Sequence, residues 1–550
     1  MTSPALHFLP LGGAGEIGMN LNLYEYNGKW LMVDLGVSFG EDDVPGIDVV
    51  MPDPAFIIER KNDLAGIVLT HAHEDHLGAV AWLWPFLRCP VYATPFAAHI
   101  LMGKLKEAGL DGEVPVEVRQ LGARFDVGPF NIELITLTHS IPEPNALAIR
   151  TPAGCVLHTG DWKFDPNPVI GETTDTDRLR ELGDEGILAM VCDSTNVFNP
   201  GEAGSEGDVQ DSLVDLIAGL KNRVAVACFA SNVARLSSIA KAARDCGREV
   251  ALVGRSMHKM AEAARATGHL DPDIKFVSDT EIGYLPREKA LLICTGSQGE
   301  PRAALAKIAT DNHPHVVLDK DDSVVFSSRM IPGNEKSIAR LQNLLAERGI
   351  NVITAKDHFI HVSGHPGRDE LAEMYRIARP RIAIPVHGER RHMEEHAKLA
   401  LECQVSQSIV APNGSMIRLT DGKATQVDEV FHGRLAVDGM RLLPITSPVF
   451  KERKRLLFQG AVFASLVFDA ADMLATEPEI TILGLLDDEE YDDIIDEMIE
   501  EIEKTVRKMR ARDRGNDDSV ETVVRQAIRR VIREATGKKP QSEIHIARLQ

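Results

Sequence analysis

Residues 66–78 read Gly-Ile-Val-Leu-Thr-His-Ala-His-Glu-Asp-His-Leu-Gly. The apolar, β-branched run at the start predicts a short buried strand. His71 and His73 are two residues apart, so on an extended chain their imidazoles point to the same side. Asp75 and His76 follow where the chain should turn into a helix. Three imidazoles and a carboxylate within six residues indicate a site for zinc or a similar divalent ion; a polar loop with incidental histidines is the alternative.

Three other stretches place a possible ligand in the same setting. Each is an apolar run that ends in a histidine or an aspartate, as expected where a strand runs into a loop. A centre for two metal ions needs more ligands than residues 66–78 supply. The repeated setting therefore predicts one dinuclear centre built from several strand ends. The stretches are Thr136-Leu-Thr-His139-Ser140, Val156-Leu-His-Thr-Gly-Asp161 and Ile382-Ala-Ile-Pro-Val-His387.

Length, composition and charge limit the kinds of protein that this sequence can encode. The length of 550 residues predicts about three domains, and 44% hydrophobic residues support sizeable cores. The formal net charge of −22 argues against a wholly basic nucleic-acid binder. A local positive channel is still compatible with it, because fields are screened within about 10 Å. The seven cysteines are scattered, and neither a secretory signal nor a membrane-spanning run is evident, so we expect a cytoplasmic protein with no membrane partner.

The order of apolar runs and turns predicts an α/β protein with several segments. Short strands with glycine-rich turns come first. Strand–helix units typical of a parallel-sheet α/β domain are inserted before the last histidine-bearing strand end. A linker and a small α/β domain follow. The predicted boundaries are 1–206, 207–350, 351–443, a linker at 444–455 and a C-terminal domain at 456–550.

The C-terminal domain is expected to pair subunits. The runs Leu456–Phe468 and Glu477–Leu485 predict strands, and two helices should follow them. Residues Asp487–Glu503 form an amphipathic pattern, with an apolar stripe beside a strongly acidic, solvated face. The stripe is too apolar to be left bare. We therefore expect a homodimer or a homotetramer.

Polar side chains follow the predicted strands of the inserted segment. In parallel sheets, ligands bind at the carboxyl ends of the strands. Hydroxyl and amide donors at such ends suit phosphate groups. Ordinary helix capping is the alternative for each residue taken singly. The side chains are those of Ser231, Asn232, Ser297, Gln298, Ser327, Ser328 and Arg329.

Two acidic features lie near the N-terminal strands. Asp34 ends a predicted strand and is expected to orient a ligand histidine. Glu41–Asp48 is an acidic loop, interpreted either as a solvated turn or as a structural Ca²⁺ site. Its spacing is not that of an EF-hand.

The motifs resemble those of the metallo-β-lactamase superfamily and, in their details, those of the ribonuclease J family of the β-CASP branch. They run in the same order along nearly the whole chain. The resemblance implies a metallo-β-lactamase αββα sandwich with an inserted parallel-sheet α/β β-CASP domain and a small C-terminal α/β domain that takes part in assembly. The motifs are His71–His76, Leu11–Gly18, Thr138–Pro142, Thr159–Asp165, Asp193–Asn196, His361–His365 and Pro385–Glu389.

The resemblance also implies a role for each ligand. One metal ion would be held by His71, His73 and His139, the other by Asp75, His76 and His387, and Asp161 would bridge them. Zn²⁺ is expected, with Mn²⁺ or Mg²⁺ as alternatives. Two such cations lower the pKa of a shared water and so generate the attacking hydroxide.

The proton for the leaving oxygen is assigned by the same resemblance. His365 is expected to be the general acid, and Asp193 to orient it. An adjacent carboxylate and a phosphate would favour the protonated imidazole. Together with Asp75, these are the predicted catalytic residues.

The implied substrate is single-stranded RNA. The resemblance implies 5′-to-3′ exonuclease activity with a preference for a 5′-monophosphate, together with endonuclease activity, in RNA maturation and decay. Other RNA-decay proteins are possible partners. The terminal phosphate would be bound by Ser231, Asn232, Val233, His361, Val362, Ser363, Gly364 and His365.

Two other functions fit part of the pattern. A dinuclear hydrolase could act on a small thioester or lactam, but a small substrate needs no inserted second wall. A catalytically silent scaffold for RNA processing should have lost a ligand or the acid, whereas every one of these positions is filled here.

Overall fold

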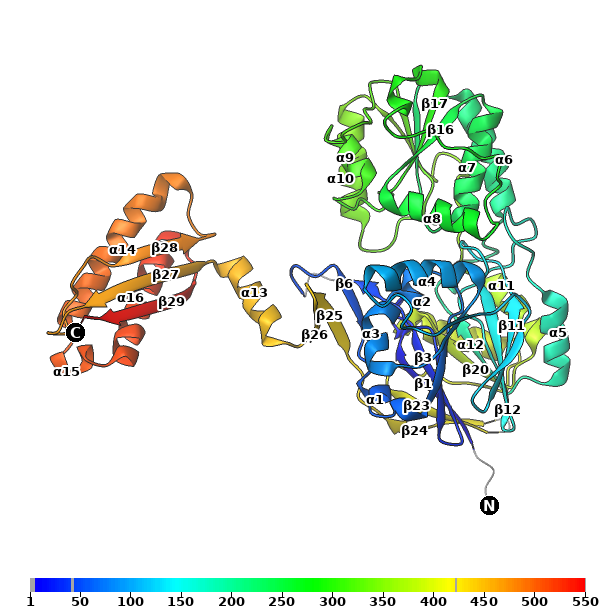
Figure 1. The fold of residues 1–550 in the computed structure, drawn as a ribbon, viewed down its shortest axis with the longest axis horizontal. Helices are drawn as coiled ribbons and strands as arrows, with labels where there is room; N and C mark the ends of the chain where they lie inside the picture. The colour runs from blue at the N-terminus through cyan, green and yellow to red at the C-terminus, as the bar shows by residue number, and fades with distance from the viewer. Residues whose placement is uncertain (1–4, 41–43, 421–422, 550) are drawn as a thin grey trace. The chain divides into compact units, whose positions relative to one another are not determined.

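The computed structural model describes residues 5–40, 44–420 and 423–549. They divide into two compact units, residues 1–38 with 50–434 and residues 39–49 with 435–550 (Figure 1). Residues 41–43 of the acidic loop lie outside the described residues, and the Ca²⁺ site expected there stays a prediction. No helix in the described part of the chain is long and apolar enough to cross a membrane.

The first unit contains a sandwich of two mixed sheets. Side chains such as Phe8, Tyr24 and Leu147 fill the space between them. The eight-stranded sheet has the order β24 (Lys423–Glu429), β23 (Ser415–Thr420), β1 (Leu6–Gly12), β3 (Leu21–Tyr26), β4 (Lys29–Val33), β7 (Leu64–Val68), β8 (Val91–Ala93), β9 (Val116–Val118). The seven-stranded sheet has the order β10 (Arg124–Val127), β11 (Phe130–Thr136), β12 (Asn145–Thr151), β13 (Gly154–His158), β14 (Ala189–Asp193), β20 (Ile382–Val386), β22 (Gln407–Ser408).

Helices cover the outer faces of this sandwich. Every residue of β14 and β20 is buried, because one face meets the other sheet and the second face meets helices. The helices on that second face are α5 (Thr176–Glu185), α11 (Arg368–Ala378) and α12 (Arg390–Glu402). On the other side, α4 (Pro95–Glu107) packs on β8 and β9, and α3 (Val80–Leu87) packs on α4. The predicted αββα sandwich is confirmed.

The inserted segment forms the predicted parallel sheet. Its strands, drawn in green in Figure 1, are all parallel and have the order β16 (Glu249–Val253), β17 (Ala290–Cys294), β15 (Val224–Ala227), β18 (Ser323–Phe326), β19 (Asn351–Ile353). The accompanying helices are α6 (Glu206–Gly219), α7 (Val233–Asp245), α8 (Arg255–Ala266), α9 (Ala304–Ala309) and α10 (Glu335–Glu347). Apolar residues of these strands, α9 and α10 form one core.

The second unit differs from the prediction in two respects. The run Leu456–Phe468 is not one strand, because α13 (Pro448–Gln459) extends through most of the predicted linker and into the run, and β27 begins only at Ala461. Ser447 Oγ caps α13, and Pro448 has a fixed φ that suits the first helical position. Gly460, with a φ of +64°, ends the helix.

The second difference concerns the apolar stripe. It lies on α14 (Asp488–Lys508) and packs inside the same unit, against α16 (Asp517–Thr536) and the sheet β28–β27–β29 (Glu479–Leu483, Ala461–Phe468, Gln541–Arg548). The stripe is therefore not bare in the single chain, and the pairing of subunits stays a prediction. Short elements complete the fold: β2 (Ala14–Gly15), β5 (Ser38–Phe39), β6 (Val49–Pro52), β21 (Gly388–Glu389), β25 (Arg434–Asp438), β26 (Arg441–Pro444), α1 (Ala55–Ile58), α2 (Glu74–Leu77), α15 (Ala511–Arg514) and the 3₁₀ turns Lys61–Asp63, Ile282–Tyr284 and Arg287–Lys289.

Candidate metal centre

The seven predicted ligands converge where strands of the two sheets end. His71 and His73 follow β7, with Asp75 and His76 on α2, while His139, Asp161 and His387 follow β11, β13 and β20. Close backbone packing holds α2 in place. A Cβ at Gly36 would lie 1.7 Å from the carbonyl oxygen of Asp75, so only glycine fits there.

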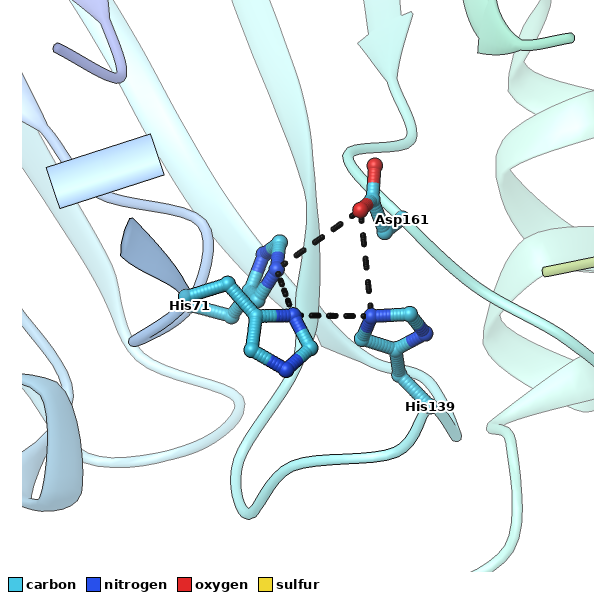
Figure 2. Close-up of side chains that lie close together, drawn as sticks. His71, His139 and Asp161 are labelled. Atoms are coloured by element: carbon cyan, nitrogen blue, oxygen red, sulfur yellow. Dashed lines mark hydrogen bonds and ion pairs between the residues drawn. The ribbon is translucent and has the colours of Figure 1, made fainter. Parts of the chain in front are cut away.

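The first group of ligand atoms belongs to His71, His73, His139 and Asp161, and these atoms lie within 4.8 Å of one another. His73 Nδ1 lies 3.0 Å from His71 Nε2 and 3.1 Å from His139 Nε2. Figure 2 shows His71 and His139 facing Asp161, whose Oδ2 is 3.8 Å and 3.7 Å from their Nε2 atoms.

The second group consists of Asp75, His76, Asp161 and His387. His76 Nε2 lies 3.2 Å from Asp161 Oδ2, and His387 Nε2 lies 3.1 Å from Asp75 Oδ2. Asp161 is the one carboxylate common to both groups, which is the arrangement that a bridging ligand needs.

The chemistry of both groups fits divalent cations. Three ring nitrogens that face one another cannot all be paired by hydrogen bonds, and Asp161 Oδ1 is buried without a hydrogen-bond partner. Burial and the neighbouring histidines hold the pKa of His71 and His139 well below the ordinary value, so both rings are neutral ligands. Burial also lowers the pKa of His73 to about 4.

Two carboxylates give the second group of ligand atoms a negative electrostatic potential. Burial disfavours the charged imidazole of His76, but Asp161 and Asp75 outweigh it and raise the pKa of His76 well above the ordinary value. Carboxylates that stabilise a proton in this way also attract a metal cation. The centre therefore combines neutral nitrogen donors on one side with anionic oxygen donors on the other.

Supporting hydrogen bonds orient the ligands. Asp34 Oδ2 lies 2.7 Å from His76 Nδ1, which bears out the role expected for Asp34. Thr195 Oγ1 lies 2.8 Å from His387 Nδ1, and Asn20 Nδ2 donates to the carbonyl of Asp75 at 3.0 Å. Sequence reasoning missed Thr195 and Asn20. Thr195 lies inside the quoted motif Asp193–Asn196, and Asn20 lies two residues after the motif Leu11–Gly18; these positions are their only signal.

His365 and Asp193 lie beside the ligands as a hydrogen-bonded pair. His365 Nδ1 is 2.8 Å from Asp193 Oδ2 and 3.9 Å from Asp161 Oδ2. The other oxygen of Asp193 accepts from the backbone and hydroxyl of Thr195, which fixes the carboxylate. Burial lowers the pKa of His365, but Asp193 and Asp161 outweigh it and raise the pKa above the ordinary value.

The residues predicted to bind a terminal phosphate fall on two walls. Ser231, Asn232 and Val233 lie at the start of α7, and Asn232 Oδ1 accepts the backbone N–H of Arg235 at 2.8 Å. Helix capping is therefore part of the role of Asn232. The second wall is the loop of residues 360–365.

Several groups on the second wall already have hydrogen-bond partners within the protein. Ser363 Oγ accepts from Asn196 Nδ2 at 2.7 Å, and the Gly364 carbonyl pairs with His139 Nδ1. Val362 is buried. Both ring nitrogens of His361 are buried without a hydrogen-bond partner, and burial, with the cations Arg235, Arg329 and Lys163 nearby, lowers its pKa to about 3.

Arg235 joins the two walls and was missed by sequence reasoning. It is fully buried, pairs with Glu206 at 2.9 Å, and donates from Nη1 to the carbonyl of Ile360 at 2.9 Å and to Ser327 Oγ at 2.7 Å. A buried arginine with several fixed acceptors is a rigid spacer. The start of α7 and the loop before His361 are therefore held together by one side chain.

Known proteins resemble this chain over most of its length. Family models match residues 18–227 (Metallo-beta-lactamase superfamily), 221–345 (Ribonuclease J, beta-CASP domain), 349–406 (Zn-dependent metallo-hydrolase RNA specificity domain) and 448–547 (Ribonuclease J C-terminal domain). A solved protein of unknown function from Enterococcus faecalis V583 has a similar fold, with a TM-score of 0.55 at 16% identity, over 76% of this chain and 100% of its own.

Several curated relatives are named ribonuclease J. The one from Sinorhizobium meliloti is 47% identical over 89% of this chain and 87% of its own length. That from Corynebacterium glutamicum is 38% identical over 88% and 68%, and that from Thermus thermophilus is 34% identical over 83% and 81%.

Proposed function

The chain belongs to the ribonuclease J family and is a metal-dependent ribonuclease; we propose that it shortens RNA stepwise from a 5′-monophosphate end and also cuts internally. The observation that carries the proposal is the pair of ligand groups that share Asp161, with His365 and Asp193 beside them. The match to an RNA specificity domain and the ribonuclease relatives favour RNA over a thioester or lactam. A silent scaffold is disfavoured because all seven ligand side chains are present and converge.

Two divalent ions, Zn²⁺ before Mn²⁺ or Mg²⁺, are assigned to the two groups. Bound there, they would supply the acidity that makes water a nucleophile near neutral pH and the positive charge that offsets a phosphodiester. His71, His73 and His139 would hold one ion, Asp75, His76 and His387 the other, and Asp161 would touch both.

His365 is assigned the transfer of a proton to the leaving oxygen. Its Nδ1 is engaged by Asp193, which leaves Nε2 as the nitrogen that can give up a proton. Asp193 stabilises the imidazolium and fixes the direction of the ring, while Thr195 holds Asp193. A neutral ring after transfer would regain its proton from solvent.

The 5′ end is assigned to the space between the start of α7 and the loop of residues 361–365. The group assigned to hold the phosphate there is the neutral Ser231 hydroxyl, because the backbone N–H groups of Val233 and Arg235 are already paired with Ser231 and Asn232. Burial, with Arg235, Arg329 and Lys163 nearby, lowers the pKa of His361 to about 3, so its ring is neutral as well. Such a pocket suits one phosphate and releases the product more easily than exposed arginines would.

Each segment is assigned a part in this activity. Residues 1–206 and 351–443 would form the metallo-β-lactamase domain, 207–350 the β-CASP domain and 456–550 an assembly domain, in line with the family matches. Assembly as a homodimer or homotetramer is supported by apolar side chains exposed on α13, Leu457 at 68% and Phe458 at 59%.

One pair of RNA substrates tests the direction of degradation and the preference for a 5′-monophosphate end. A single RNA labelled at its 3′ end is prepared with a 5′-monophosphate or a 5′-triphosphate. We expect a ladder that shortens from the 5′ end for the monophosphate, slower shortening for the triphosphate, and internal cuts in both. Equal rates for the two ends, or shortening from the 3′ end, would contradict the proposal.

A further inference from the structure

An exposed phenylalanine lies next to the loop that carries Asp193. Phe198 is 51% exposed, although it belongs to the turn that follows β14. A single exposed apolar side chain is common and needs no explanation. The surroundings of Phe198 distinguish it from the other exposed apolar residues of the chain.

The backbone on either side of Phe198 is fixed. Asn196 is 2% exposed and donates from Nδ2 to Ser363 Oγ and, at 3.0 Å, to the carbonyl of His365. Asn199 donates from Nδ2 to Asn196 Oδ1 at 3.0 Å. The turn is therefore tied to the general-acid loop, and the phenyl ring is held at a set distance from it.

Cationic and aromatic groups of α12 surround the ring. Arg391 Cζ lies 5.8 Å from the ring centroid, and the His392 ring meets Phe198 edge to face at a centroid distance of 5.2 Å. A Cβ at Gly388 would lie 2.9 Å from His392 Cβ, so His392 packs directly on the residue that follows the ligand His387. His392 thus links the Phe198 ring to the strand end that carries His387.

A second arginine reaches the same turn from the inserted domain. Arg329 follows β18, is exposed, and donates from Nη1 to Asn196 Oδ1. One guanidinium group therefore lies beside the exposed ring and a second is bonded to the turn that carries it, although the whole chain has a net charge of −22. Proteins that bind single-stranded nucleic acid combine an exposed aromatic ring with cations in this way.

We propose that Phe198 is a stacking platform for one unpaired nucleobase, with Arg391 supporting the ring and Arg329 facing the adjoining phosphate. The inference rests on the proposed ribonuclease function and adds a base subsite to it. Because every base has an aromatic face, the subsite would be tolerant of sequence and would require an unpaired strand. It would hold the strand in register while His365 acts.

Abasic RNAs test the subsite on the protein loaded with its metal ions. A 5′-monophosphorylated RNA is made intact and with one abasic nucleotide at each successive position near the 5′ end. For the unmodified protein, we expect kcat/KM to fall by about tenfold at one position of the series. Phe198→Ala should cleave intact RNA with a kcat/KM about tenfold lower, and an abasic nucleotide at that position should cause no further loss. In Phe198→Trp the abasic nucleotide should still lower kcat/KM.

Binding gives a readout that does not depend on cleavage. Fluorescence anisotropy in the presence of a chelator measures the affinity for RNA. The affinity of the unmodified protein should fall at the same abasic position, and Phe198→Ala should bind intact RNA more weakly by a similar factor. Phe86→Ala is the matched control, because Phe86 on α3 is exposed to a similar extent, at 47%.

The outcomes distinguish the base-subsite proposal from the proposed ribonuclease function. If Phe198→Ala keeps the abasic profile of the unmodified protein, the base subsite is wrong and the ribonuclease function stands. If the unmodified protein neither binds nor cleaves RNA, both fail. Thermal unfolding of each variant identifies a loss that comes from misfolding, and the Phe198→Trp result then decides.

Discussion

At the scale of single residues, Asp161 is the side chain on which both ligand groups depend. Its Oδ2 lies within 3.8 Å of ring nitrogens in each group, whereas His73 belongs to the first group alone. Loss of Asp161 should therefore affect both ions, and loss of His73 only one.

We expect Asp161→Asn to bind neither ion firmly and His73→Gln to retain one. Activity should fall by more than the about 10- to 100-fold that a supporting hydrogen bond contributes to a metal site. Elemental analysis of the unmodified protein should give two ions per chain. One ion in the unmodified protein, or two in Asp161→Asn, would refute the bridging assignment.

Ser231 is the cleaner probe of the 5′-end pocket, because Asn232 also caps α7. We expect Ser231→Leu to suppress stepwise release of mononucleotides at least about tenfold, since the side chain fills the space of a phosphate and removes a hydroxyl donor. Internal cutting need not fill the pocket and should persist. The product ladder from a labelled RNA measures both activities.

Parallel loss of internal cuts in Ser231→Leu would assign the residue to general RNA binding or to the fold. Ser256→Leu is a control in the first turn of α8, another helix of the same domain that has a serine near its start. It should leave both activities unchanged.

The convergence of the predicted ligands could be foreseen because they obey a local rule, apolar strand followed by polar side chain, that is visible at His71, His139 and His387 alike. Arg235 and Thr195 obey no such rule. Their partners, Ile360 and His387, lie far away in the sequence and become neighbours only when the sheets assemble. Spacing along the chain carries no record of such contacts.

At the scale of elements, one carboxylate joins three strands and a helix. Glu133 on β11 accepts from Arg124 on β10, Arg150 on β12 and Arg178 on α5, at 2.7, 2.6 and 2.7 Å. Burial raises the pKa of Glu133, but these arginines outweigh it and lower the pKa to about 2.

This network should make stability depend on pH. The folded pKa of Glu133 is below the value of about 4.3 for an unfolded chain, so its contribution is complete above that value and is lost as pH falls toward 2. Glu133→Gln should cost about 1–3 kcal/mol at pH 7. Urea unfolding at pH 7 and pH 4 should show a smaller difference between the two proteins at the lower pH; a difference that grows on acidification would contradict the assignment.

The sequence predicted the strands that end in candidate ligands, β7, β11, β13 and β20, and failed at α13. Leu456 to Phe458 continue an apolar run that reads as β, but Ser447, Pro448 and Gly460 impose a helix with defined ends. Local capping chemistry outweighed the hydrophobic pattern there.

At the scale of the whole molecule, the proposed assembly would rest on surfaces that the chain does not cover itself. The stripe on α14 is satisfied within its own unit, so the exposed Leu457 and Phe458 on α13 are the better candidates for a subunit contact. A periodic pattern shows that a face is apolar, but it does not show what covers that face.

We expect the double variant Leu457→Glu, Phe458→Glu to form a smaller species than the unmodified protein. Charged side chains should be excluded from an apolar contact between subunits. Light scattering coupled to size exclusion measures the mass, and far-UV circular dichroism checks the fold. An unchanged mass would remove α13 from the interface.

The order of the ligands along the chain has a consequence for protein synthesis. His71 to Asp161 leave the ribosome early, but His387 follows β20, which pairs with β14 across the whole inserted domain. Domains fold in the order of their synthesis, so the growing chain completes its parallel-sheet domain while the metal centre still lacks a ligand. We therefore expect a growing chain to be inactive toward the message being translated until most of it has been made. Ribosome-bound chains arrested before residue 382 should leave RNA uncut, and chains arrested well beyond residue 443 should cleave it.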